Sequence, residues 1–199
     1  LGEVLFNIDT QLNEADRLIH VNDLTLRRMQ LRRIEAEVSG TQFERRADDP
    51  QHLYLQILAQ FNARRRAHLD ALESERSALA KARQELRGAE EVESKLRRVA
   101  PIYKQQEQAW DQLAKEGYAG KLLALERSRS RIENEQDLQA QAAAVSGAKA
   151  AINATELRIV QLDSCYRREL SNERIEVLPQ LDRLQQDLAL ADVVDDNNR

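Results

Sequence analysis

Apolar residues recur every three or four positions along most of the chain, which is the spacing of one face of an α-helix. Three such stripes occupy residues 10–39, 51–116 and 121–191, and each predicts one helix. The second stripe changes phase by one residue near Gly88, which predicts a local change in coiled-coil winding. Its members are Leu69, Leu72, Arg76, Leu79, Arg83 and Leu86, then Leu96, Val99, Tyr103, Gln106, Trp110 and Leu113.

The third stripe is regular over its first part and shifts phase once before Val177. Gly147 interrupts it, at a cost of roughly 1 kcal/mol relative to alanine, which a helix this long tolerates. A single long helix is therefore predicted from residue 121 to 191. Its apolar face consists of Val145, Ala148, Ile152, Thr155, Ile159, Leu162 and Tyr166, then Val177, Leu181, Leu184, Leu188 and Ala191.

Glycine and proline mark where these helices begin, end and bend. Gly40 is suited to the left-handed end of the first helix, and residues 40–50 form a polar connection. Asp49 and Pro50 predict the start of the second helix, with the Asp49 carboxylate accepting from its first free N–H groups. We expect Pro101 and Pro179 to kink their helices without ending them.

The two ends of the chain differ from the helical stripes. In residues 1–9, Val4, Phe6 and Ile8 partly alternate with polar residues, which predicts a short strand. Asp9 or Thr10 is then expected to cap the first helix. Residues 192–199 are acidic and polar, and we expect a frayed end there.

The strongest reversal signal lies at residues 117–120, where Gly117 fits a helix C-terminus and Gly120 follows closely. At ~1.5 Å per residue, the flanking helices would be about 97 Å and about 105 Å long. Two helices of nearly equal length joined by a tight turn predict an antiparallel hairpin. The shorter first helix is expected beside its base as a third helix. The predicted fold class is all-α.

Composition narrows the possible functions. The 199 residues include one Cys, three His and eight aromatic residues, and the net charge is −4. One cysteine excludes an internal disulfide or a cysteine-based zinc site, and no apolar run reaches the length of a membrane span. Nearly balanced charges give no general attraction to nucleic acid, which we exclude as a partner.

No constellation of residues predicts catalysis. His20, His52 and His68 lack metal-ligand spacing, and no catalytic residue, cofactor or metal is expected. The run from Arg64 to Arg66 is interpreted as a solvated helix face, with a contact to a neighbouring subunit or an exporter as the alternative. We expect Cys165, a small residue, to be partly buried near the seam.

Two segments carry a resemblance to a known family. Residues 2–9 (GEVLFNID) resemble the edge of a lipoyl half-motif that precedes the hairpin in periplasmic adaptor, or membrane fusion, proteins. Residues 113–126 (LAKEGYAGKLLALE) resemble the hairpin tip of the haemolysin secretion protein D branch of that family. In the drug-efflux branch the tip carries Arg, Leu and Ser at fixed spacing. Of these, only Leu113 is retained, because Ala109 and Gly120 occupy the other two positions.

The resemblance implies a non-enzymatic adaptor of a type I secretion system in the periplasm of a Gram-negative bacterium. Such a protein joins an inner-membrane ABC transporter to a TolC-like outer-membrane channel, and its hairpins form a conduit, commonly a hexameric ring. The exported substrate is a protein such as a toxin or hydrolase. An N-terminal membrane anchor and flanking lipoyl and barrel domains are expected outside these 199 residues. The implied channel-docking residues are Leu113, Gly117, Tyr118, Gly120 and Lys121.

An alternative class is a cytosolic coiled-coil scaffold or tethering protein. The two classes differ in residues 1–9, because a scaffold has no need of a strand edge before its first helix.

Overall fold

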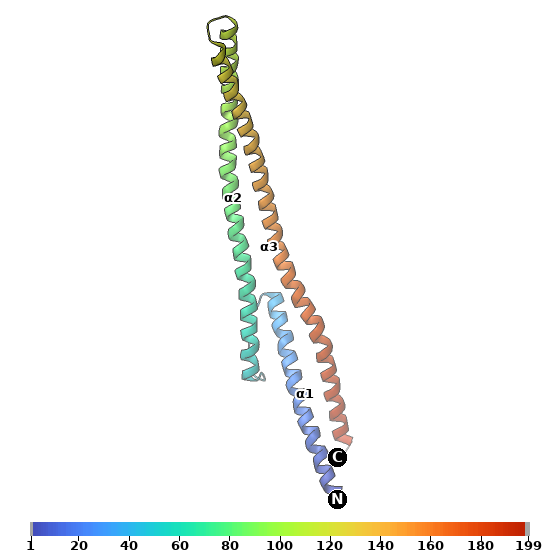
Figure 1. Cartoon of the computed structure of the whole chain (residues 1–199). Helices are drawn as coiled ribbons and strands as arrows, with labels where there is room; N and C mark the ends of the chain where they lie inside the picture. Colours follow the sequence, from blue (N-terminus) through green and yellow to red (C-terminus); the bar gives the residue numbers. More distant parts are fainter. Residues whose placement is uncertain (1, 198–199) are drawn as a thin grey trace. The chain divides into compact units, whose positions relative to one another are not determined.

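The computed structural model consists of three helices, α1 (Gly2–Ser39), α2 (Gln51–Lys115) and α3 (Lys121–Asn197) (Figure 1). The structure describes the backbone of residues 2–197 and the side chains of residues 17–189. Over that backbone there is no strand, so the predicted all-α class is confirmed. The chain divides into two compact units. One holds the chain up to Ala71 and from Gln161 onward, and the other holds Leu72–Val160.

The start of the chain corrects the sequence analysis. Residues 2–9 form the first turns of α1, so the expected strand is wrong, and so is the expected cap at Asp9 or Thr10. The alternation covered only three apolar residues. Leu5, Ile8 and Leu12 are also spaced by three and four, which is helical spacing, so the short pattern did not discriminate between the two structures.

The unit Leu72–Val160 is a two-helix antiparallel hairpin whose helices contact each other along one seam. On the α2 side, the buried and half-buried positions follow each other at alternating spacings of three and four residues. This is the heptad pattern of knobs-into-holes packing. The positions are Leu72, Glu75, Leu79, Ala82, Leu86, Ala89, Glu93, Leu96, Ala100, Tyr103, Glu107, Trp110 and Ala114.

This seam has no phase change near Gly88, contrary to our expectation. Arg76 and Arg83, which we placed in the seam, are exposed, and the positions next to them, Glu75 and Ala82, face α3 instead. Gln106 and Leu113 are likewise exposed, beside Glu107 and Ala114. The predicted seam started from Leu69 and ended at Leu113, which are both exposed, so every second position was displaced by one residue, in opposite directions in the two halves.

On α3, the same alternating spacing runs from Arg127 to Tyr166, and then the buried positions shift to Leu170, Val177 and Leu181. The predicted phase shift before Val177 is confirmed. Both helices continue through their prolines, Pro101 and Pro179. The expectation that neither proline ends its helix is also confirmed.

In the other unit, α1 packs against the first turns of α2 and the later part of α3. Ile34 lies against Leu170 and Val177 of α3 and is fully buried. A second buried cluster joins α1 to the connection and to α2, and it consists of Met29, Ala36, Phe43, Ile57 and Phe61. Phe43 stacks on Tyr54 with ring centroids 5.5 Å apart, so part of the connection that we described as polar is core.

Asp49 has a different role from the one we predicted. Among the described contacts, its carboxylate forms an ion pair with Arg32 at 2.5 Å and accepts a hydrogen bond from the backbone N–H of Arg46 at 2.8 Å. The first bond of α2 runs instead from the N–H of Tyr54 to the carbonyl of Pro50, at 3.0 Å. Asp49 therefore ties the connection to α1 and does not cap α2.

Candidate functional site: the hairpin tip

The turn between α2 and α3 is closed by backbone hydrogen bonds around a left-handed glycine. Gly117 has a φ of 83°. The N–H of Tyr118 donates to the carbonyl of Leu113 at 2.9 Å, and the N–H of Gly117 donates to that of Ala114 at 3.2 Å. These two bonds are those of a Schellman motif with Gly117 at its C′ position. The predicted helix C-terminal cap at Gly117 is confirmed.

Replacing glycine by alanine is expected to have opposite effects on the stability of the hairpin at Gly117 and at Gly147. Gly117→Ala places a Cβ at positive φ, so we expect it to destabilise the hairpin by about 1–2 kcal/mol. Gly147 lies inside α3, and a Cβ added there would meet only open space, so Gly147→Ala is expected to stabilise the hairpin by about 0.5–1 kcal/mol. Urea unfolding followed by circular dichroism checks both signs, and equal effects would contradict the assignment of backbone strain to Gly117.

Four large apolar side chains in or next to the turn are exposed. Tyr118 is 81% exposed, Leu122 74%, Leu125 58% and Leu113 37%. In a Schellman motif the residues at the positions of Tyr118 and Leu113 usually contact each other. The high exposure of Tyr118 leaves most of its ring in solvent. These four side chains leave apolar surface at the tip open to solvent.

The structure brings the five predicted tip residues together within one turn of chain. Leu113 lies in the last turn of α2, Gly117 and Gly120 bound the reversal, and Lys121 begins α3. Sequence reasoning missed the exposed leucines Leu122 and Leu125 as part of the same surface. Leu122 and Leu125 are three residues apart, which places them on one face at the start of α3, and that spacing was the signal that could have included them.

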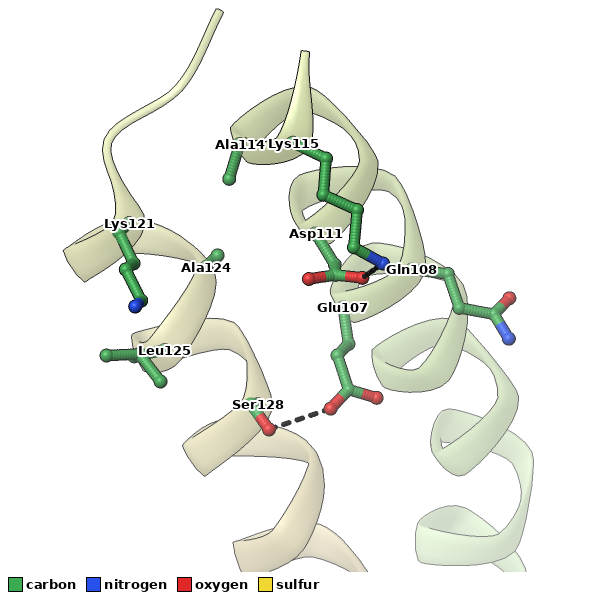
Figure 2. Close-up of a pocket in the computed structure, with 9 residues that line it drawn as sticks. All are labelled: Glu107, Gln108, Asp111, Ala114, Lys115, Lys121, Ala124, Leu125 and Ser128. Atoms are coloured by element: carbon green, nitrogen blue, oxygen red, sulfur yellow. Dashed lines mark hydrogen bonds and ion pairs between the residues drawn. The ribbon is translucent and has the colours of Figure 1, made fainter. Parts of the chain in front are cut away.

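Below the turn, a cleft of about 580 Å³ opens between the two helices (Figure 2). The carboxylate of Glu107 accepts from the hydroxyl of Ser128 at 2.7 Å and pairs with Arg131 at 2.6 Å. Nearby, Asp111 forms an ion pair with Lys115, also at 2.6 Å. The two contacts of Glu107 therefore link α2 to α3 at the cleft, whereas the Asp111–Lys115 pair lies within α2. Its lining residues are Glu107, Gln108, Asp111, Ala114, Lys115, Lys121, Ala124, Leu125 and Ser128.

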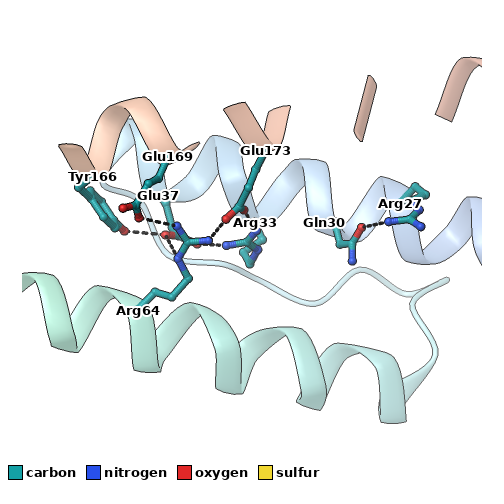
Figure 3. Close-up of polar contacts among 8 residues, drawn as sticks. All are labelled: Arg27, Gln30, Arg33, Glu37, Arg64, Tyr166, Glu169 and Glu173. Carbon is teal, nitrogen blue, oxygen red and sulfur yellow. Dashed lines mark hydrogen bonds and ion pairs between the residues drawn. The ribbon is translucent and has the colours of Figure 1, made fainter. Parts of the chain in front are cut away.

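A second polar site lies in the other unit, where α1, α2 and α3 meet (Figure 3). The carboxylate of Glu37, whose side chain is fully buried, accepts from Arg33 at 2.5 Å and from the hydroxyl of Tyr166 at 2.6 Å. Glu173 on α3 pairs with both Arg33 and Arg64. Arg64 also lies near Glu37, at 3.9 Å. We refer to Arg33, Glu37, Arg64, Tyr166 and Glu173 as the base network.

Contacts within the base network change the pKa values of two of its members, Tyr166 and Glu173. Burial raises the pKa of the Tyr166 phenol, and its hydrogen bond to Glu37 raises it further. Burial alone would raise the pKa of Glu173, but the hydrogen bonds from Arg33 and Arg64 outweigh it and lower that pKa. Tyr166 therefore remains a neutral donor and Glu173 a charged acceptor at neutral pH. This arrangement ties α1, α2 and α3 together through paired charges and hydrogen bonds.

The other residues singled out from the sequence differ in their surroundings. Arg64 belongs to the base network, whereas Arg66 is exposed and pairs with Asp70, so the run of arginines is only partly a solvated face. Cys165 is exposed, contrary to the expected partial burial. His68 stacks on Tyr166 with centroids 4.1 Å apart. The described residues contain no group of side chains able to hold a metal ion, and none of the described helices is apolar enough over a sufficient length to cross a bilayer.

Comparisons with known proteins agree with this architecture. A family profile described as "AprE, long alpha-helical hairpin" matches residues 13–194. The chain belongs to this AprE hairpin family. It is a family of membrane fusion proteins, so the predicted membership among membrane fusion proteins is confirmed. No curated protein is significantly similar in sequence.

The AprE hairpin fold of this chain is also found in a solved structure. The soluble domain of LipC, described as a membrane fusion protein of a type I secretion system, superimposes with a TM-score of 0.83 at 18% identity. The similarity covers 94% of this chain and 92% of that one. The AprE profile spans both long helices and the tip, so the candidate site lies within the family's hairpin.

Proposed function

We propose that this AprE hairpin is the adaptor segment of a type I protein secretion system. The observation that carries the proposal is the family match over residues 13–194, which includes the tip. The likeness to LipC supports it, because that protein is described as a membrane fusion protein of such a system. The chain would work as a spacer and conduit, with no chemistry of its own.

In this proposal the hairpin lies in the periplasm of a Gram-negative bacterium and joins an inner-membrane ABC transporter to a TolC-like outer-membrane channel. The protein is anchored in the inner membrane by a segment outside these 199 residues. Several copies, six in the resembling adaptors, form a ring through which the exported protein passes. Nearly balanced charge suits flanks that pack against copies of themselves, because it avoids strong mutual repulsion.

The tip is the proposed contact with the channel. Tyr118 and Leu122 supply exposed apolar surface, and the Schellman motif at Gly117 holds the turn in one conformation. A rigid, apolar projection loses little conformational entropy on binding. Leu113, Gly120 and Lys121 complete the proposed docking surface.

Crosslinking in living cells tests the tip contact. A Cys165→Ser background removes the native exposed thiol, and Tyr118→Cys then places one thiol at the tip. A thiol-reactive photo-crosslinker at this position is expected to capture the outer-membrane channel, identified by mass spectrometry. Gln84→Cys, on an exposed position of α2 within the hairpin flank, is the matched control and is expected to capture no channel. Channel capture from both positions, or from neither, would contradict the proposal.

A further inference from the structure

The cleft below the tip exists because its facing side chains are small. Ala114 lies on the α2 side, and Ala124 and Ser128 lie on the α3 side (Figure 2). Large apolar side chains at such facing positions fill the space between paired helices in a coiled coil. Here the small residues leave a cavity of about 580 Å³, a volume in the range of binding pockets.

The walls of the cleft combine apolar surface with charges that are already paired. Leu125 and the alkyl stems of Lys115 and Lys121 contribute apolar surface, since long basic side chains cover it with their methylene groups. Asp111 is paired with Lys115, and Glu107 with Arg131. The acidic groups of the cleft are thus neutralised from within the hairpin.

Lys121 differs from these residues, because within the described part of the chain it makes no ion pair. It begins α3, where the first turn contains no acidic residue and the helix dipole is positive. The N–H groups of Leu123 and Ala124 donate to the carbonyl of Gly120, at 3.0 and 3.4 Å. Because Asp111 and Glu107 are engaged by Lys115 and Arg131, Lys121 is the basic residue of the cleft lining that has no ion-pair partner among the described residues.

We propose that the cleft receives a large aliphatic side chain from the periplasmic end of the outer-membrane channel, and that a carboxylate next to that side chain pairs with Lys121. The inference rests on the proposed function and specifies its partner chemistry. The small side chains of Ala114, Ala124 and Ser128 define the space, and the uncompensated charge of Lys121 selects an acidic neighbour. The exposed leucines Leu122 and Leu125 lie next to the cleft and extend the same contact.

Filling the cleft tests its role as a socket. Ala124→Leu places a large side chain in the cavity, whereas Ala143→Leu makes the same change at an exposed position of α3 outside the tip. The probe is the purified TolC-like channel of the same bacterium in nanodiscs, titrated with the 199-residue chain by biolayer interferometry. We expect Ala124→Leu to raise the Kd at least tenfold and Ala143→Leu to leave it unchanged, with equal helical content in both.

Changing the charge at Lys121 tests the carboxylate. Lys121→Glu is expected to raise the Kd at least tenfold, and Lys121→Arg, which keeps the charge, to retain binding. Lys95→Glu, at an exposed position of α2, is the matched control. Raising the salt concentration is expected to weaken binding by the wild-type chain and not by Lys121→Glu, because salt screens exposed charges.

The outcomes separate this inference from the function on which it rests. Unchanged channel binding by Ala124→Leu or by Lys121→Glu overturns the inference and leaves the adaptor function standing. No channel binding by the wild-type chain, with the channel shown to be folded, overturns both. If Ala124→Leu instead changes the sedimentation coefficient of the isolated chain, the cleft is a contact between copies of the hairpin, and the inference fails.

Discussion

Replacing Tyr118 and Leu122 together by serine is expected to reduce export of the secreted protein at least tenfold. These are the two most exposed large apolar side chains among the described residues, at 81% and 74%. Truncating an interface anchor of this kind typically costs about 2 kcal/mol or more, so losing two weakens each docking contact by about 1,000-fold. Neither side chain is part of the packed seam, so the hairpin is expected to remain folded. The measurement is secreted protein per cell, with the level of the adaptor determined in parallel.

The control for this prediction is Gln105→Ser, which truncates an exposed polar residue of α2 in the same half of the hairpin. It removes no apolar surface, and normal export is expected. Normal export from the Tyr118 and Leu122 double variant would show that the apolar tip does not carry the docking energy. A loss of helical content in that variant would instead show that these two side chains stabilise the folded hairpin.

Replacing Glu37 by alanine is expected to release α1 from its packed position. The change leaves Arg33, which is 3% exposed, with Glu173 as its remaining acidic partner and removes the acceptor of the Tyr166 hydroxyl. Breaking a buried ion pair from one side costs about 3–5 kcal/mol, and we expect a value near the lower end because Arg33 keeps Glu173, which it shares with Arg64. Hydrogen exchange of α1 amides is then expected to accelerate at least 100-fold.

Glu35→Ala is the matched control for Glu37→Ala, because Glu35 lies on the same helix and is exposed. Its α1 amides are expected to exchange as in the wild-type chain. The amides of α2 between residues 75 and 110 lie in the other unit and serve as an internal reference for both variants. Equal exchange of α1 in the two variants would mean that the base network does not hold α1 in place.

The sequence predicted the features that depend on local chemistry. Helical spacing identified all three helices, and the need for a residue without a Cβ at positive φ identified Gly117 as the end of α2. The error at residues 2–9 arose because three alternating residues fit both a strand and a helix. The register error in α2 arose because the stripe was counted from Leu69, which is exposed, so steps of three and four residues selected Arg76 and Arg83 in place of Glu75 and Ala82.

The base network and the cleft were not predictable in the same way. Arg33 and Glu173 are 140 residues apart in sequence, and Glu37 and Tyr166 are 129 apart. Nothing local to either residue indicates its partner. Likewise, Ala114 and Ala124 are ordinary helix formers, and a cavity arises only where α2 places one opposite the other. Pairing across a fold determines both features, and a single sequence contains no direct record of it.

The unbroken heptad seam of the hairpin limits how its length can change during evolution. Each buried position recurs after seven residues, from Leu72 to Ala114 on α2 and along the facing part of α3. Removing seven residues from each helix would shorten the hairpin by about 10 Å and leave every remaining seam residue facing its partner helix. Removing four or five residues from each helix would rotate the tip about the helix axis. Part of the seam would then face solvent. The hairpin is therefore a spacer whose reach is adjustable in whole heptads, with the direction of Tyr118 preserved at each step.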